Sequence, residues 1–431
     1  MQSNEYSPYD AYDYVGGTTN EPMDDESGFL MTSGGMAGST RATDVNFEDP
    51  KVASMPKILL MGPRRGGKTS IQRVVFQKMS PHETLFRLEA TQGLERAVVD
   101  HTPLCRFTVW DFPGDYYGED EDVFGGSTSL IFVVDAQDEP YDHVLQSFTT
   151  VVTRALESNP NVVIEVFINK VDGELFLSDE SKYDCRRDIM TQVTDELTEA
   201  GVSPDSVHIR YHLTSIYDHS IYEALSRVVQ RLIPQLPTLE NLLSVLVSTC
   251  SMEKAYLFDV VSKLYISTDP GPVDMQSVEL CSDMIDVVLD VSGIYGLGPS
   301  QLDLGHGGVV DTVSVASGDP TGTTNGSQPN AEGRKGIDTS NPDELVGTLI
   351  SQAPAEDLEE EMVDPDSAYD SESASVIKLS NGMVLYLREV DTMLALVCIT
   401  RSENFRKKAL INYNIGSLKK ALRALVSENG H

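Results

Sequence analysis

A glycine-rich stretch, GPRRGGKT at residues 62–69, follows the apolar run KILLM and precedes a segment of helical character. This order of strand, glycine loop and helix is typical of a loop whose backbone N–H groups surround phosphate oxygens. Lys68 is predicted to reach the phosphates and to be catalytic, and the Thr69 hydroxyl is predicted to bind Mg²⁺. The residues of this loop predicted to contact the phosphate ligand are Arg64, Arg65, Gly66, Gly67, Lys68, Thr69 and Ser70.

A second motif, WDFPG at 110–114, follows another apolar run at the distance expected of a D-x-x-G motif. Asp111 is predicted to hold Mg²⁺ through water, and the Gly114 N–H is predicted to contact the γ-phosphate. The motif is weak alone, but it becomes specific when it follows a phosphate loop. Gly114 and the next residue, Asp115, are therefore candidate catalytic positions.

A threonine between these two motifs is expected to close on the metal. Thr91, in LEATQGLE, is the favoured candidate, and Thr84 is the alternative. Both are predicted nucleotide contacts, and the predicted metal ligands are Thr69, Thr91 and Asp111.

A third motif, NKVD at 169–172, ends the apolar run VVIEVFI and indicates which base is bound. A carboxylate such as Asp172 can accept hydrogen bonds from both N1–H and the exocyclic amine of guanine, a donor pair that adenine lacks. Asn169 belongs to the same motif, and Lys170 is predicted to lie over the base. Ser215 and Ile216, in LTSI, are predicted to form the loop whose backbone contacts guanine O6. The predicted ligands are therefore GTP and GDP, with Mg²⁺.

The 431-residue chain has a formal net charge of −35, and most of this charge lies in two segments. Residues 1–50 contain ten acids and one Arg, and residues 300–372 contain sixteen acids and two bases, which leaves −12 for the remainder. Both segments are rich in Gly, Ser, Pro, Asp and Glu, so they bury too little apolar surface to offset the entropy of ordering. We therefore expect a disordered acidic leader and insert, and no nucleic-acid partner, because phosphate binding needs clustered Lys and Arg.

The five cysteines are scattered and include no C-x-x-C pair, so we expect thiols rather than a disulfide or metal framework. The sequence has no secretory signal, no apolar run near ~20 residues and no lipidation motif. No direct membrane insertion is therefore expected, and any membrane attachment would come through a partner.

Apolar runs bounded by loops recur along the first half of the chain, at 57–61, 105–110, 129–136, 162–168 and 207–213. Longer mixed segments separate them, which predicts a mostly parallel α/β sheet with helices between its strands. A helix that ends near Pro237 is expected to close this unit. The predicted organisation is a disordered leader at 1–54, followed by a first domain at 55–237.

A second domain is predicted at 238–427, with Thr238 as the N-cap of its first helix. Two strands and a helix follow, and the acidic insert then interrupts the domain at about 298–373. Asn381-Gly382 predicts a hairpin in which both turn residues have positive φ. One further strand and a helix from about 403 to 426 complete an α+β arrangement.

Long strings of this sequence resemble the Rag GTPases, and specifically the RagC/RagD subtype. They are KILLMGPRRGGKTSIQRVVFQKMSPHETLF, WDFPG, VFINKVDG, YHLTSIYDHSIYEALSRVVQRLIPQLPTLENLL, KAYLFDVVSKLYI and PVDMQSVELCSDMIDVV. The resemblance covers about 56–297 and 374–427, but neither the leader nor the insert. It implies a Ras-like P-loop GTPase domain followed by a roadblock/longin-type dimerisation domain.

The resemblance also implies partners and a role. A RagA/RagB-type GTPase would pair with this chain, and the heterodimer would relay amino-acid sufficiency to the TOR kinase complex, with the GDP-loaded form of this subunit active. A lipidated roadblock scaffold would hold the heterodimer at the lysosome or vacuole surface, and activating proteins would stimulate its hydrolysis. The protein is therefore expected in the cytoplasm on that surface, with the nucleus as a second location.

Two residues depart from the pattern of the family. Ras-like enzymes and RagC-type proteins carry Gln after D-x-x-G to position the attacking water, whereas this chain has Asp115. A carboxylate cannot donate to the γ-phosphate and adds negative charge beside it, so we expect GTP hydrolysis that is slow without an activating protein. Asn169 is the residue of ordinary GTPases, whereas RagC-type proteins often carry His there.

Two functions from different classes are compatible with these residues. The first is a regulatory GTPase of the RagC/D type, whose switches change partner affinity. The alternative is an assembly scaffold with a retained but barely hydrolytic nucleotide pocket, which Asp115 favours. A stand-alone trafficking GTPase is disfavoured by the second domain and by the lack of a lipidation motif.

Overall fold

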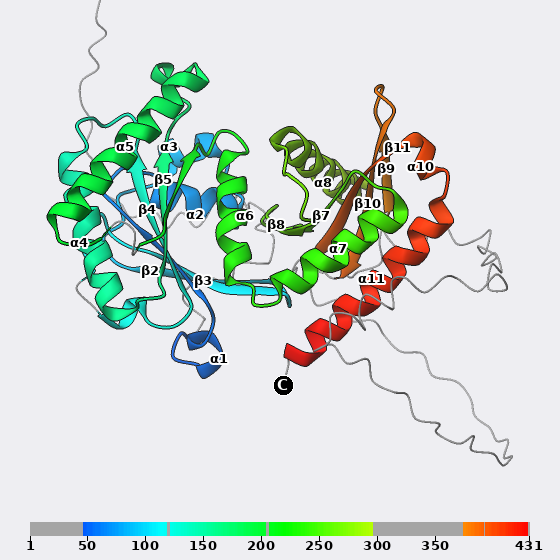
Figure 1. Ribbon diagram of the computed structural model, residues 1–431, viewed down its shortest axis with the longest axis horizontal. Coiled ribbons are helices and arrows are strands. Elements are labelled where there is room, and N and C mark those ends of the chain that lie inside the picture. Colours follow the sequence, from blue (N-terminus) through cyan, green and yellow to red (C-terminus); the bar gives the residue numbers. More distant parts are fainter. Residues whose placement is uncertain (1–45, 119–120, 204–206, 296–373, 392, 430–431) are drawn as a thin grey trace, which may run out of the picture. The chain divides into compact units, whose positions relative to one another are not determined.

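The computed structural model describes residues 46–118, 121–203, 207–295, 374–391 and 393–429. The predicted insert and the first 45 residues of the predicted leader lie outside the described residues. The described chain contains two β-sheets, each with its own helices (Figure 1).

The first sheet has six strands in the order β2-β3-β1-β4-β5-β6. They are β1 (Lys57–Met61), β2 (Glu95–Thr102), β3 (Cys105–Asp111), β4 (Thr128–Asp135), β5 (Val163–Asn169) and β6 (Ile209–Thr214). The β2–β3 pair is antiparallel and the other pairs are parallel, so the prediction of a mostly parallel sheet is confirmed. Edge strand β2 was not predicted, because its sequence ERAVVDHT lacks a long apolar run.

Helices cover both faces of this sheet (Figure 1). On one face α4 (Asp142–Ser158) and α5 (Asp179–Glu199) bury an apolar cluster, and on the other face α2 (Lys68–Gln77) and α6 (Ser220–Leu232) bury a second. Because both faces are covered, the central strands carry near-continuous apolar runs. Asp135 ends β4 and Asn169 ends β5, so polar side chains stand at the carboxyl ends of these two strands. The shorter helices are α1 (Pro50–Ala53), α3 (Pro81–Arg87), η1 (Glu121–Phe124) and η2 (Glu174–Phe176).

Helix α1 lies within the predicted disordered leader, so that prediction is wrong for these residues. The Asp49 side chain caps the helix by accepting a hydrogen bond from the Lys51 N–H at 2.9 Å, and Pro50 suits its first turn. Just before it, the Phe47 ring lies 5.8 Å from the Arg96 guanidinium, which ties this segment to β2.

The second sheet has five antiparallel strands in the order β8-β7-β11-β10-β9. They are β7 (Lys254–Asp259), β8 (Tyr265–Thr268), β9 (Ala374–Lys378), β10 (Met383–Asp391) and β11 (Leu394–Arg401). Helices α7 (Leu236–Cys250) and α11 (Lys408–Asn429) pack on one face, and α8 (Met275–Tyr295) packs on the other. The predicted order of elements in this α+β region is confirmed.

Three details of this region differ from the prediction. Helix α7 begins at Leu236 with Gln235 as its N-cap, so the N-cap prediction for Thr238 is wrong; Pro237 lies in the first turn, where its missing N–H removes no helical hydrogen bond. In the β9–β10 hairpin only Gly382 has positive φ, 84°, because the loop is longer than two residues. The last helix is divided, with α10 (Ser402–Phe405) before α11.

Each of the five cysteines is buried and carries a free thiol. Burial raises the pKa of Cys250 to about 11 and that of Cys281 to about 12. None of the described helices combines the length and the hydropathy that a membrane span needs.

Candidate nucleotide site

The loop between β1 and α2 follows a path that requires glycine at two positions. Gly62 has φ 130°, and a Cβ there would lie 2.4 Å from the carbonyl oxygen of Val133. Gly67 has φ 105°, and its Cβ would lie 2.4 Å from Nδ2 of Asn169. The loop is therefore pressed against β4 and the NKVD motif. Helix α2 begins directly after it, at Lys68, which places the positive end of the helix at the loop.

The Lys68 side chain is buried inside this loop. Its ammonium donates hydrogen bonds to the carbonyl oxygens of Gly62, at 2.7 Å, and Pro63, at 2.9 Å. Burial lowers the pKa of Lys68, and the charges of Asp111 and Asp115 oppose that shift. A polyanion such as a nucleotide phosphate would offset the desolvation of this cation.

Three oxygen-bearing side chains from separate segments meet at the start of α2. The Thr69 hydroxyl donates to Oδ2 of Asp111 at 2.5 Å and lies 2.7 Å from the Thr91 hydroxyl. These are the three predicted metal ligands, and the structure brings all of them together. The other candidate, Thr84, is buried in α3 and donates to the Pro81 carbonyl at 2.7 Å, so its hydroxyl closes the first turn of that helix and is not part of this cluster.

The chemistry of the cluster fits Mg²⁺. Asp111 is 0% exposed, and its Oδ1 accepts no hydrogen bond from the described residues. The pKa of Asp111 is raised to about 6, because the effect of burial is larger than the opposing effects of the Thr69 hydrogen bond and the Lys68 charge. Because Mg²⁺ prefers oxygen ligands, Thr69, Thr91 and Asp111 would hold it, with Asp111 acting directly or through water. The ion would neutralise phosphate charge.

The D-x-x-G turn packs directly on the phosphate loop. A Cβ on Gly114 would lie only 2.3 Å from the backbone nitrogen of Arg64, so the two chains touch at this point. Arg64 also forms an ion pair with Asp115, with Nη2 and Oδ2 3.4 Å apart and side chains that are 53% and 65% exposed. Solvent screening makes such a pair weak, yet it places a cation beside the unusual carboxylate. Arg65 is exposed, with φ 65°.

The NKVD residues connect the strand end to both neighbouring loops. The Asn169 amide donates to the Gly66 carbonyl at 2.9 Å, and its oxygen accepts from the Thr214 hydroxyl at 3.2 Å. The exposed Asp172 accepts at Oδ1 from the Ser215 hydroxyl at 2.7 Å. Ser215 is thus a side-chain partner of Asp172, in addition to its predicted backbone role. Ile216 is half-buried in the same loop, and Ser70 is half-buried on α2.

Two residues around Lys170 were missed by the sequence analysis. The Lys170 ammonium pairs with Oδ2 of Asp135 at 2.5 Å, and its carbonyl accepts from the Gln137 amide at 2.7 Å. Lys170 itself has φ 66°. Asp135 lies opposite Asn169 in the β4–β5 register, so the rule that neighbouring parallel strands end at one edge would have found it.

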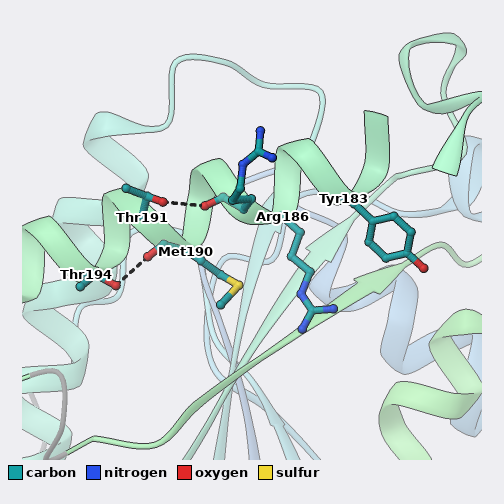
Figure 2. Close-up of a pocket in the computed structure, with 6 residues that line it drawn as sticks. Tyr183, Arg186, Met190, Thr191 and Thr194 are labelled. Carbon is teal, nitrogen blue, oxygen red and sulfur yellow. Dashed lines mark hydrogen bonds between the residues drawn. The ribbon is translucent and has the colours of Figure 1, made fainter. Parts of the chain in front are cut away.

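Two hollows accompany these elements. One, of about 160 Å³, lies between the phosphate loop, the D-x-x-G turn and α4; its lining includes Gly62, Gly114, His143 and Ser147. The other, of about 410 Å³, is an open hollow lined by six residues of α5, including Tyr183, Arg186 and Met190 (Figure 2). Two of these residues, Thr191 and Thr194, donate to carbonyls of their own helix. None of its lining residues is a predicted nucleotide contact.

A phosphate loop, an adjoining Thr–Asp cluster and an NKVD loop at the carboxyl edge of a mostly parallel sheet define a Ras-like P-loop G protein. The family model described as the Gtr1/RagA G protein conserved region matches residues 57–285. The chain belongs to this family of G proteins, as its resemblance to Rag GTPases predicts.

Relatives that match most of the chain are of the C/D and Gtr2 kind. The chain is 45% identical over 375 residues to Ras-related GTP-binding protein C of Homo sapiens, covering 86% of this chain and 76% of that protein. It is 45% identical over 377 residues to GTP-binding protein gtr2 of Schizosaccharomyces pombe, covering 86% and 98%. It is 36% identical over 377 residues to GTP-binding protein GTR2 of Saccharomyces cerevisiae, covering 86% and 92%.

Proposed function

We propose that this chain is the RagC/D-type subunit of a Rag heterodimer and that it binds GTP or GDP with Mg²⁺. The observation that carries the proposal is the convergence of Thr69, Thr91 and Asp111 at the first turn of α2. Membership of the Gtr1/RagA family supports it. The exposed Asp172 carboxylate, oriented by Ser215, supports guanine as the base.

Native purification followed by identification of the bound nucleotide tests this proposal. We expect guanine nucleotides to be recovered with the chain, and recovery of adenine nucleotides would contradict the assignment of Asp172. The Asp172→Asn variant should prefer xanthosine nucleotides, because an amide can donate to the 2-oxo group that replaces the amine of guanine.

We assign nucleotide binding to residues 55–237 and pairing with a RagA/RagB-type GTPase to residues 238–427, as a roadblock-type domain. Two features support the second role: β9 is an edge strand, and α8 presents exposed apolar side chains at Leu280, Val287 and Val291. A strand edge that pairs with no other described strand, beside an apolar helix face, is suited to continuing a sheet into a second chain. Co-expression with a RagA-type chain should yield a stable complex, whereas recovery of a homodimer alone would contradict this role.

In this role the heterodimer relays amino-acid sufficiency to the TOR kinase complex from the lysosome or vacuole surface, where a lipidated roadblock scaffold attaches it. Similarity to Gtr2 and to Ras-related GTP-binding protein C supports this assignment. Imaging of the tagged chain should show it on that surface only when the scaffold is present. A distribution that does not change when the scaffold is deleted would contradict the mode of attachment.

A second function, assembly with little turnover, is favoured by one observation. Asp115 stands where a water-positioning residue is expected, and its charge is paired with Arg64. The two functions differ in whether the nucleotide changes partner binding. Equal affinity of the GDP- and GTP-loaded chain for its partners would support the scaffold, and unequal affinity would support the switch.

A further inference from the structure

An aromatic pair joins α3 to the loop that follows β6. The His82 and Tyr217 rings have centroids 5.4 Å apart and an interplanar angle of 52°. Both side chains are exposed, and Tyr217 is 42% accessible. The pair is therefore a surface contact between two segments rather than part of an apolar core.

Tyr217 belongs to the loop proposed to read the base. Its backbone N–H donates to the Ser215 hydroxyl at 3.1 Å, and that hydroxyl donates to Asp172 at 2.7 Å. A short chain of contacts thus runs from the His82 ring to the carboxylate proposed to recognise guanine.

The segment that carries His82 is fastened at a second point, near its other end. Thr91 lies 2.7 Å from Thr69, beside the proposed metal site. The segment between α2 and β2 therefore contacts the base-reading loop through His82 and the phosphate end of the site through Thr91.

The large apolar side chains of α3, Leu85 and Phe86, do not pack into a core that would fix the position of this segment. Leu85 is 68% exposed and Phe86 is 87% exposed, whereas the buried Thr84 hydroxyl bonds within the helix. The His82 ring contact therefore links α3 to the base-reading loop without support from Leu85 or Phe86.

We propose that His82 and Tyr217 form a clasp that closes α3 over the guanosine end of the bound nucleotide and slows its release. This inference rests on the proposed function. Because the clasp is at the guanosine end, it acts equally on GDP and GTP. The Thr91 contact, at the phosphate end, distinguishes them. An aromatic pair of this kind corresponds to a change of about three- to tenfold in a rate.

Release of fluorescent GDP and GTP from the full chain, chased with excess unlabelled nucleotide, tests the clasp. His82→Ala and Tyr217→Ala should each speed release of both nucleotides by the same factor, about three- to tenfold. The double variant should be no faster than the faster single variant, because one contact is lost in all three. His82→Phe keeps a ring and should release at nearly the original rate, and Leu85→Ala, an exposed change on the same helix, should leave release unchanged. Thr91→Ala should speed release of GTP more than that of GDP.

The outcomes separate the clasp from the proposed function. An original chain that binds neither guanine nucleotide overturns the proposed function and the clasp with it. Normal binding with unchanged release from His82→Ala overturns the clasp alone. Multiplicative effects of the two Ala changes would also overturn it, because the residues would then act independently. Equal thermal melting of the nucleotide-free variants would show that faster release does not come from loss of folding.

Discussion

Asp115 is the residue of the site whose side-chain chemistry we propose to affect turnover rather than binding. It follows Gly114, whose backbone touches the phosphate loop, and its carboxylate faces Arg64 at 3.4 Å. A carboxylate there can accept a hydrogen bond from water, but it adds negative charge close to the phosphate end of the site. Arg64 reduces that charge only in part, because both side chains are largely exposed.

Asp115→Gln should raise the single-turnover rate of GTP hydrolysis by at least about tenfold, a barrier change of about 1.4 kcal/mol. The physical reason is that an amide can donate to the γ-phosphate while it accepts from water. The measurement is phosphate release after mixing the GTP-loaded chain with Mg²⁺. Asp195→Gln, an exposed change on α5, should have no effect. A rate for Asp115→Gln that is no faster than the original would contradict this account.

Gly114→Ala should weaken nucleotide binding by about five- to over a hundredfold, because the new Cβ must displace the backbone of Arg64, 2.3 Å away, or move the turn. Overpacking of this kind costs about 1–3 kcal/mol. Titration with fluorescent GDP measures the effect. The matched control is Gly93→Ala, since a Cβ there meets nothing within 4 Å. Similar affinities of the two variants for GDP would show that nucleotide binding does not need the close approach of Gly114 to Arg64.

At the scale of elements, a buried charge on β5 ties two neighbouring elements to the sheet. Glu165 is 0% exposed, and one carboxylate oxygen lies 2.8 Å from Nε2 of His212 on β6. The other oxygen contacts the Arg231 guanidinium on α6. The strand that ends in NKVD is therefore joined to the strand and helix that flank the base-reading loop.

Glu165→Gln should lower the free energy of unfolding by about 3 kcal/mol, because it leaves a half-buried Arg231 without its counter-charge. Chemical denaturation of the purified chain gives this value. Glu157→Gln, an exposed change on α4, is the control and should have little effect. A loss below ~1 kcal/mol for Glu165→Gln would mean that the ion network adds little to stability.

The elements could be predicted wherever one physical signal was strong. Buried strands such as β1 and β4 contain long apolar runs, so their positions follow from the sequence. Strand β2 and helix α3 were not predicted, because one is a half-polar edge strand and the other exposes Leu85 and Phe86. Short, partly exposed elements are stabilised by contacts with neighbouring elements, and these contacts leave no hydrophobic pattern in the local sequence.

At the scale of the whole molecule, α8 should decide how the chain pairs with its partner. Val287 is 55% exposed on this helix, so Val287→Asp should leave thermal melting nearly unchanged. It should weaken pairing with a RagA-type chain at least about tenfold, because a charge would be buried in the interface. The measurement is co-purification at graded concentrations. Leu177→Asp, at an 86% exposed position after η2, should leave pairing intact; equal losses would point to a general effect of added charge.

The candidate site contains some features that the sequence predicts and others that depend on how the whole chain folds. The three motifs predict phosphate, metal and base contacts, because each motif is local. The cross-contacts could not be read in this way: Asn169 binding the Gly66 carbonyl and Thr91 reaching Thr69 depend on how distant segments pack. The choice between Thr84 and Thr91 was open for the same reason.

The buried thiols have a consequence for following the motions of this chain. Cys105 and Cys185 belong to the elements of the first sheet, and Cys250, Cys281 and Cys398 belong to those of the second. Burial raises the pKa of each, so the reactive thiolate forms only when the surrounding structure opens. The rate at which an alkylating reagent modifies each cysteine would therefore report the rate of local unfolding around it. Mass spectrometry of the alkylated peptides would give this rate separately for the region of each sheet.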